Sequence, residues 1–304
     1  LPYISSYHNV LNRFYTTESV EGPFDVIVIG SGASGLTCGA MLSSAGKKVL
    51  VLEQHFQSGG FTHTFTRGNF EWDVGIHYFG KSPYTSTWYL QIKGLTNGRF
   101  QMEPFGEYLD ELHFPDFHML VPNGYENYEK ALIERFPKEE KGIKKYFSAI
   151  RYARRKLQIY FTMNLLPRPL TKLARKTIVR KAHKLATSTT DQVMSKYLKD
   201  EKLKSVLDAQ WGNIGAPRGY CSFMAHAAMV GNYHETGGEY PIGGGAVFAK
   251  ELGRVIYNAG SAIRVKAGVE KLIIKDDAVQ GVVLESGEEI FAPVVISSSG
   301  VFNT

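Results

Sequence analysis

The stretch from Phe24 to Gly60 constrains the fold more than any other part of the sequence. It opens with an apolar run of β-branched residues, Val26 to Ile29, and passes directly into a glycine-rich turn, Gly30 to Gly35. A small-residue helical pattern follows, and a second apolar run, Val49 to Leu52, ends on Glu53. This order predicts a strand, a glycine turn, a helix and a second strand, which together form a dinucleotide-binding unit.

Each glycine of the turn has its own physical role. Gly30 permits the tight exit from the strand, Gly32 lets the backbone approach a pyrophosphate, and Gly35 lets the helix pack against the strand. Ala33 and Ser34 open the helix, where unpaired N–H groups and the positive end of the helix dipole favour phosphate. The turn therefore predicts a site for the pyrophosphate of a dinucleotide.

The residues after the second strand extend this prediction. Glu53 stands at the carboxyl end of that strand, where a carboxylate can accept the hydroxyls of an adenosine ribose, and Gln54 follows it. A second glycine pair, Gly59-Gly60, gives the backbone another close approach to the cofactor. An ordinary loop turn is the alternative interpretation of this pair.

Composition limits the remaining possibilities. A chain of 304 residues is long enough for two domains, and no stretch reaches 18 uninterrupted apolar residues, so we expect no transmembrane helix. Cys38 and Cys221 form neither a disulfide framework nor a metal motif. We also expect no metal, because His55, His63 and His77 lack the spacing of ligands on one helix.

The segment Lys141–Thr190 is strongly basic. It contains 14 lysines and arginines and no acid, so the rest of the chain would carry −8 instead of the overall +6. Apolar residues recur at steps of three or four and predict a helix: Ile143, Phe147, Ile150, Ala153, Leu157 and Tyr160. A second basic amphipathic pattern covers Leu170 to Leu185. Such a segment either lies on an anionic membrane surface or is a solvated charged face, and without a binding motif we do not expect nucleic acid.

Weaker patterns complete the chain. Gly68 and Asn69 separate two strand-like runs, Phe100 to Val121 is also strand-like, and Tyr128 to Phe136 is helical. Thr189 and Gln192 have the spacing of a capping box. The patterns further predict a helix over Phe223–Val230, an amphipathic helix from Val247 to Ile256 and a β-rich portion over Ala262–Gly300.

Several longer motifs have no general dinucleotide-binding meaning, and with the glycine turn they span nearly the whole chain. The chain resembles the all-trans-retinol 13,14-reductases (retinol saturases), in the carotenoid isomerase and phytoene desaturase branch of the FAD-dependent oxidoreductases. The motifs that carry this resemblance are VIGSGASGL (28–36), VLEQH (51–55), SGGFTHTF (58–65), DVGIHYFG (73–80), SFMAHAAMVGNY (222–233), GGEYPIGGG (237–245) and the closing VVIS and GVFNT.

The resemblance implies an α/β fold: a Rossmann-like FAD-binding domain with a parallel sheet and a β-meander, plus a partly present helical and β substrate domain. It implies FAD-domain parts at 1–80 and 236–304 and an inserted, membrane-facing substrate region at 81–235. The backbone near Val269 would then meet the adenine. Because family members continue further, we expect this chain to be truncated at its C-terminus and to correspond to their amino-terminal half.

The resemblance also implies a reaction. FAD would serve saturation of a carbon–carbon double bond in a retinoid, with NAD(P)H as a candidate electron donor. Carotenoid cis–trans isomerisation or desaturation is the alternative, and a non-catalytic membrane-surface or partner-binding module is another. His77 and Tyr78 are weak candidates for the catalytic proton donor. A peripheral location at the endoplasmic reticulum membrane is implied, or the plastid for a carotenoid enzyme.

Overall fold

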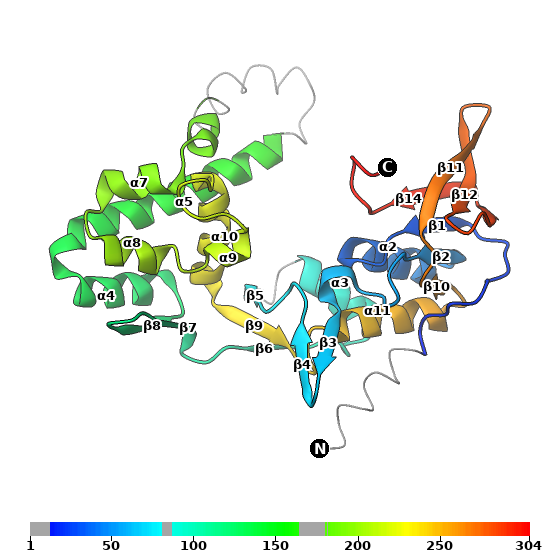
Figure 1. Cartoon of the computed structure of the whole chain (residues 1–304), viewed down its shortest axis with the longest axis horizontal. Helices are drawn as coiled ribbons and strands as arrows, with labels where there is room; N and C mark the ends of the chain where they lie inside the picture. The colour runs from blue at the N-terminus through cyan, green and yellow to red at the C-terminus, as the bar shows by residue number, and fades with distance from the viewer. Residues whose placement is uncertain (1–12, 81–86, 164–179, 181) are drawn as a thin grey trace. The chain divides into compact units, whose positions relative to one another are not determined.

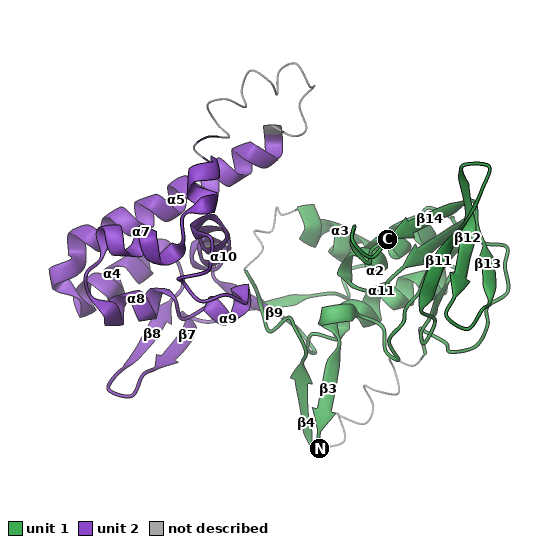
Figure 2. Ribbon diagram, turned by 45° about the horizontal axis from the view of Figure 1, so that its top comes forward, with its two compact units in different colours: residues 1–103, 240–304 green, residues 104–239 purple. Residues whose placement is uncertain are grey.

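The protein is described by a computed structural model, which covers residues 13–80, 87–163, 180 and 182–304 (Figure 1). The chain divides into two compact units: unit 1 is Leu1–Glu103 with Tyr240–Thr304, and unit 2 is Pro104–Glu239 (Figure 2). The insertion predicted from the sequence covers residues 81–235, and unit 2 covers Pro104–Glu239. Tyr89 and Ile92, which the prediction assigns to the insertion, are buried in the core of unit 1.

A four-stranded parallel sheet is the centre of unit 1. Its order is β10-β2-β1-β14, and β1 pairs in parallel with both β2 and β14. The strands are β1 (Val26–Ile29), β2 (Val49–Leu52), β10 (Ala262–Arg264) and β14 (Val294–Ser297). The short β-branched runs suit strands that are covered on both faces. The predicted α/β fold with a parallel sheet is confirmed.

Different elements cover the two faces of the sheet. One face packs against α2 (Ala33–Ser44), α3 (Thr87–Leu95) and α11 (Val247–Asn258). The other packs against the antiparallel meander of β11 (Val269–Lys275), β12 (Ala278–Leu284) and β13 (Glu289–Phe291). Alternation along β1 explains the sorting, since Val26 and Val28 face the helices whereas Ile27 faces the meander.

The remaining elements of unit 1 are short. Strands β3 (Thr64–Arg67) and β4 (Phe70–Asp73) form the hairpin predicted around Gly68 and Asn69. A three-stranded sheet has the order β5-β9-β6. Strand β5 (Phe79–Gly80) lies in unit 1, whereas β9 (Gly238–Pro241) and β6 (Met102–Pro104) include the points where the chain passes from one unit to the other. A 3-10 turn, η1 (Gly60–Thr62), begins at the second glycine of the pair Gly59-Gly60.

Unit 2 is mainly helical. It begins with the hairpin of β7 (Tyr108–His113) and β8 (His118–Pro122). Its helices are α4 (Tyr125–Arg135), η2 (Pro137–Glu139), α5 (Glu140–Met163), α7 (Thr190–Tyr197), α8 (Glu201–Leu207), α9 (Trp211–Ile214) and α10 (Phe223–Thr236), with further helical residues at 180 and 182–187. Helix α10 is longer than predicted and ends before Gly237, whose φ of 82° is in the left-handed region.

The long basic helix predicted from the sequence is α5. Its apolar stripe is buried at Ile143, Phe147, Ile150 and Ala153, whereas Leu157 and Tyr160 are only half-buried. Most of the second basic pattern, Leu170 to Leu185, lies outside the described residues. Within those residues, no helix is both long enough and apolar enough to cross a membrane.

The predicted capping box is confirmed at the start of α7. The Thr189 hydroxyl accepts a hydrogen bond from the Gln192 N–H at 3.2 Å, and the Gln192 side chain accepts one from the Thr189 N–H at 3.0 Å. These reciprocal bonds satisfy two backbone donors that the helix itself leaves unpaired. They fix where α7 begins.

Two buried histidines lie in the core of unit 2. His226 is hydrogen-bonded through Nε2 to the Tyr146 hydroxyl at 2.7 Å, and the His234 ring stacks on Tyr128 with centroids 4.3 Å apart. Burial lowers the pKa of His226 to about 4, and burial together with His226 lowers the pKa of His234 to about 3. Both rings are therefore neutral at pH 7.

We predict that unit 2 loses stability as the pH falls below about 6.5. The pKa of His234 is lower in the folded chain than its ordinary 6.5, so its stabilising contribution is present above that value and is lost as the pH falls toward 3. From pH 7 to pH 5 this loss is about 2 kcal/mol. His234→Phe keeps a ring on Tyr128 and removes the titration, so urea unfolding of this variant should show a flatter dependence on pH. An unchanged slope would contradict the assignment.

Candidate nucleotide-binding site

The glycine turn between β1 and α2 leaves no room for side chains at two of its positions. Gly30 has φ of 94°, and a Cβ there would lie 2.6 Å from the Ser298 hydroxyl oxygen. A Cβ on Gly35 would collide with the carbonyl oxygen of Gly30. Glycine is thus required at both positions by the packing of the chain itself.

Gly32 differs from its two neighbours in the turn. Its φ of −66° and ψ of 179° suit any residue, and a Cβ there would meet nothing within 4 Å among the described residues. Gly32 is also the N-cap of α2, and no side chain in the described part of the chain caps that helix. The first helical turn, from Ala33 to Gly35, thus presents its N–H groups beside open space, where an anion can be bound.

Glu53 is tied to this turn by buried hydrogen bonds. Its Oε2 accepts from the Ser31 N–H at 2.8 Å and from the Ser31 hydroxyl at 2.6 Å. Its Oε1 accepts from the His55 N–H at 2.9 Å. Bonds to a carboxylate are stronger than bonds between neutral groups. The carboxylate at the end of β2 therefore fixes the shape of the turn that follows the neighbouring strand β1.

The second glycine pair packs against the first turn. The Gly59 N–H donates to the Ser31 carbonyl at 3.1 Å and to the Ser31 hydroxyl oxygen at 3.2 Å. A Cβ on Gly60 would lie 2.9 Å from the Gly32 Cα. Both glycines have positive φ, 128° and 55°. The close approach that the structure shows here is therefore to the backbone of the turn.

Ser31 is the residue that sequence reasoning missed. It is fully buried, and it joins the glycine turn, the acid and the second glycine pair. The available signal was a hydroxyl between two glycines with an acid at the end of the next strand. The pairing could not be identified from the sequence because it depends on how β1 and β2 are placed side by side.

A cleft of about 490 Å³ lies at the carboxyl ends of the parallel strands. It brings together four of the predicted cofactor-binding residues, Gly30, Glu53, Gln54 and Val269. The start of β11 and the residues after β14 complete its wall. Ligands bind at this edge in open α/β sheets. The cleft adjoins the glycine turn at Gly30, so one ligand could extend from the cleft to the first turn of α2.

The two weak catalytic candidates lie elsewhere in unit 1. His77 is exposed and Tyr78 is half-buried, on the segment between β4 and β5. Neither is among the described residues that line the cleft. The structure does not bring them together with the predicted cofactor-binding residues.

Two motifs far apart in the sequence meet next to that segment. The Tyr240 hydroxyl donates to the Asp73 carboxylate and accepts from the Gly245 N–H at 3.1 Å. Burial and the hydrogen bond to Asp73 raise the pKa of Tyr240 above its ordinary value. This contact connects DVGIHYFG with GGEYPIGGG, and sequence reasoning did not foresee it.

Comparison with known proteins also indicates a dinucleotide-binding fold. Residues 28–90 match the family model "NAD(P)-binding Rossmann-like domain". All-trans-retinol 13,14-reductase of Danio rerio is 32% identical over 309 residues, which cover 98% of this chain and 51% of that protein. The Homo sapiens protein of the same name is 33% identical over 308 residues, 97% of this chain and 50% of that protein. Over nearly its whole length, this chain is similar to the all-trans-retinol 13,14-reductases.

The relationship extends to a second group of enzymes. Prolycopene isomerase 1, chloroplastic, of an Oncidium hybrid cultivar is 30% identical over 295 residues, 92% of this chain and 49% of that protein. The chain thus spans about half the length of the retinol reductases and of this isomerase.

Solved structures share the fold at lower identity. An oxidoreductase from Methanosarcina mazei has a TM-score of 0.62 and 18% identity, over 90% of this chain and 58% of that one. A triple mutant of putrescine oxidase, from a redesign of its cofactor binding, has a TM-score of 0.59 and 17% identity, over 90% and 57%. The Rossmann-type fold expected from the retinol reductase resemblance is therefore shown by sequence and by structure.

The two helix-side glycines of the turn give a direct test of this geometry. We predict that Gly35→Ala lowers the free energy of unfolding by about 3 kcal/mol, because the new methyl group collides with backbone. Gly32→Ala should cost about 1 kcal/mol or less, since its methyl group enters open space and only the N-cap preference changes. Urea unfolding of both variants measures the difference. Equal losses would contradict the separate roles of the two glycines.

Proposed function

We propose that this chain binds the adenosine and pyrophosphate portion of FAD and belongs to a flavin-dependent oxidoreductase that saturates a double bond of a retinoid. The observation that carries the proposal is the open space beside Gly32 and the first turn of α2, with Glu53 lining the adjoining cleft. The similarity to all-trans-retinol 13,14-reductases supports the reaction class.

The residues present suit the adenosine portion of a dinucleotide. Gly32, Ala33, Ser34 and Gly35 would hold the pyrophosphate through backbone N–H groups. The Glu53 carboxylate has about four acceptor positions and uses three on Ser31 and His55, which leaves about one for a ribose hydroxyl. Fewer acceptors are free than the sequence suggested, because the protein uses most of them to hold the turn.

Other predicted residues complete the site. Gln54 and the backbone at Val269 line the cleft and would contact the adenosine. Gly59 and Gly60 would act through the turn, because they pack on Ser31 and Gly32. The site thus combines residues that touch the cofactor with residues that hold the others in place.

When bound, reduced FAD would supply the hydride for saturation of the double bond. The chain itself contributes binding and orientation of the cofactor through unit 1. The proton for the other carbon needs a donor, and His77 and Tyr78 remain the candidates of this chain. NAD(P)H is the proposed electron donor.

Carotenoid cis–trans isomerisation is the second candidate reaction. The 30% identity to a chloroplastic prolycopene isomerase favours it. Incubation of the reduced flavoprotein with all-trans-retinol and, separately, with prolycopene distinguishes the two. A dihydroretinoid product supports the reductase, and isomerised carotenoid without net reduction supports the isomerase.

Membrane association is the remaining part of the proposal. The basic segment Lys141–Leu185 would contact an anionic membrane surface from α5, which carries four cationic side chains between Arg151 and Lys156. A location at the endoplasmic reticulum membrane suits a retinoid substrate, and a plastid location suits a carotenoid. Retinoids and carotenoids are themselves lipids, so a protein at the membrane surface would lie close to substrate dissolved in the membrane.

The cofactor assignment is tested by visible absorbance of the purified chain with added FAD. We predict flavin bands that remain after gel filtration of the wild type and that fall at least tenfold in Gly32→Val, whose side chain would fill the space beside the helix N-terminus. Circular dichroism should show the variant to be folded. A wild-type chain that takes up no FAD would contradict the proposal and favour a non-catalytic module.

A further inference from the structure

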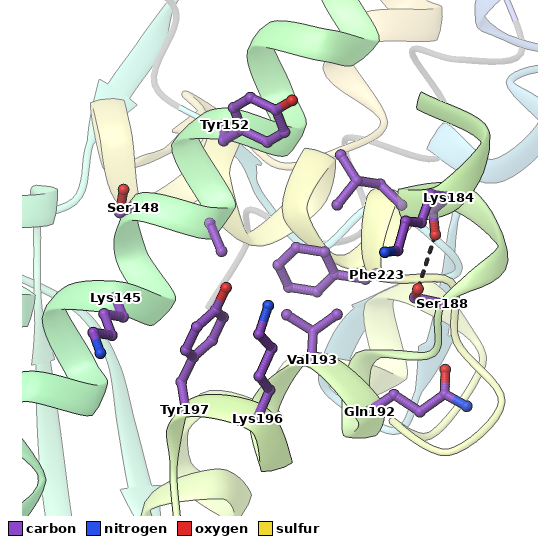
Figure 3. Close-up of a pocket in the computed structure, with 12 residues that line it drawn as sticks. Lys145, Ser148, Tyr152, Lys184, Ser188, Gln192, Val193, Lys196, Tyr197 and Phe223 are labelled. Atoms are coloured by element: carbon purple, nitrogen blue, oxygen red, sulfur yellow. Dashed lines mark hydrogen bonds between the residues drawn. The ribbon is translucent and has the colours of Figure 1, made fainter. Parts of the chain in front are cut away.

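A cavity of about 790 Å³ lies in unit 2, apart from the nucleotide-binding cleft of unit 1 (Figure 3). It is formed by α5, the helical residues 182–187, α7 and the first residue of α10. This cavity is larger than the cleft, and neither the glycine turn nor any other residue of the candidate nucleotide site contributes to it. Its lining is chemically different from that of a nucleotide site.

Two ammonium groups extend into the cavity. Figure 3 shows the side chains of Lys184 and Lys196 reaching from opposite sides toward the Phe223 ring, with the Tyr197 hydroxyl on the same side as Lys196. Within the described residues, no carboxylate forms an ion pair with either lysine. Lys196 instead lies over the Tyr197 ring at 5.1 Å. The cavity therefore presents positive charge that the protein does not neutralise by direct pairing.

The floor of the cavity is apolar. Ala149, Leu185 and Val193 are half-buried and line the cavity, and beneath them the Phe223 side chain is fully covered by its neighbours. Cations above an apolar floor suit an amphiphile whose anionic group meets the lysines while its carbon chain or glycerol backbone covers the floor. A small inorganic anion would leave the apolar part of the cavity uncovered.

The rim has the character of a membrane interface. Tyr152 lines the cavity on α5 and is 40% exposed, and the Lys156 ammonium lies 5.3 Å from its ring centroid. Partly exposed tyrosines and basic side chains are common at the level of lipid head groups. Because the rim continues into the basic surface of α5, the mouth of the cavity lies on the surface proposed to face the membrane.

We propose that this cavity binds the phosphate-bearing head group of an anionic phospholipid and so holds unit 2 on the membrane surface. The inference deepens the proposed membrane association and is independent of flavin binding. Lys184 and Lys196 would contact the phosphate, and Ala149 with Val193 would contact the apolar part of the lipid. Lys196 lies outside the basic segment in the sequence. It would add its positive charge to that of the segment, because both line the same cavity.

Vesicle co-sedimentation of the full chain at physiological salt tests this inference. The wild type should bind vesicles of phosphatidylcholine with phosphatidylserine and not vesicles of phosphatidylcholine alone. The double variant Lys184→Glu/Lys196→Glu should bind at least about tenfold more weakly. Its matched control, Lys138→Glu/Lys199→Glu, makes the same change in charge at exposed positions of unit 2 that lie outside the basic segment and do not line the cavity, and should stay within about threefold of the wild type.

A third variant separates the cavity from general electrostatics. Ala149→Phe fills the apolar part of the cavity without any change in charge, and should also weaken binding to the acidic vesicles. Equal weakening in the charge variant and its control, with no effect of Ala149→Phe, would overturn the cavity assignment while the membrane association stands. Absence of wild-type binding would overturn both.

Two further readouts complete the test. Glycerol phosphate should not displace the protein from vesicles at concentrations comparable to the lipid, and complete displacement would instead assign the cavity to a soluble phosphate.

Flavin absorbance of each variant should equal that of the wild type, because the cavity lies in unit 2. That readout keeps a failure of the lipid site distinct from a failure of the flavin site.

Discussion

The buried hydrogen bonds between Ser31 and Glu53 are the interaction on which the candidate nucleotide site of unit 1 depends. A glycine-rich turn has many accessible conformations, and fixing it costs conformational entropy. The Glu53 carboxylate offsets that cost by accepting two hydrogen bonds from Ser31. The Gly59 N–H donates a further hydrogen bond to the Ser31 carbonyl, so the second glycine pair also supports the turn. The turn is therefore held in shape before any ligand arrives, with Gly32 facing open space. Preorganisation of this kind favours ligand affinity.

The packing of the layers in unit 1 makes the contact between Ser31 and Glu53 possible. Ser31 and Glu53 can meet only if β1 and β2 are adjacent and parallel, and the two packed faces of the sheet secure that pairing. The meander brings Val269 to the same edge of the sheet, where the cleft forms. Unit 2 is built differently. Its core contains aromatic residues and neutral histidines, and the exposed face of helix α5 is strongly basic. A basic face of this kind suits contact with anionic lipid.

Local signals in the sequence predicted the parts of the fold that depend on neighbouring residues. The β-branched runs, the glycines with required conformations and the Thr189 capping box belong to this class, and the structure agrees with each. Parts that depend on long-range contacts were not predictable in the same way. The contact between Asp73 and Tyr240 joins positions 167 residues apart, and the role of Ser31 requires the strand pairing. Tyr89 and Ile92 have the spacing of any amphipathic helix, and their place in the core of unit 1 depends on partners that are distant in the sequence. The cavity of unit 2 combines residues from three separate helical segments and the start of a fourth, so no single stretch of sequence indicates it.

We propose that Ser31 and Glu53 hold a preformed site for the adenosine half of a dinucleotide. Calorimetric titration of the chain with ADP, for the wild type and for Ser31→Ala, tests this most directly. We predict that ADP binds the wild type, and that the variant, which keeps the backbone bond to Glu53 but lacks the hydroxyl, binds about tenfold more weakly while remaining folded. Equal affinity in the two proteins would show that the hydroxyl does not organise the site. Failure of the wild type to bind ADP would contradict the claim itself.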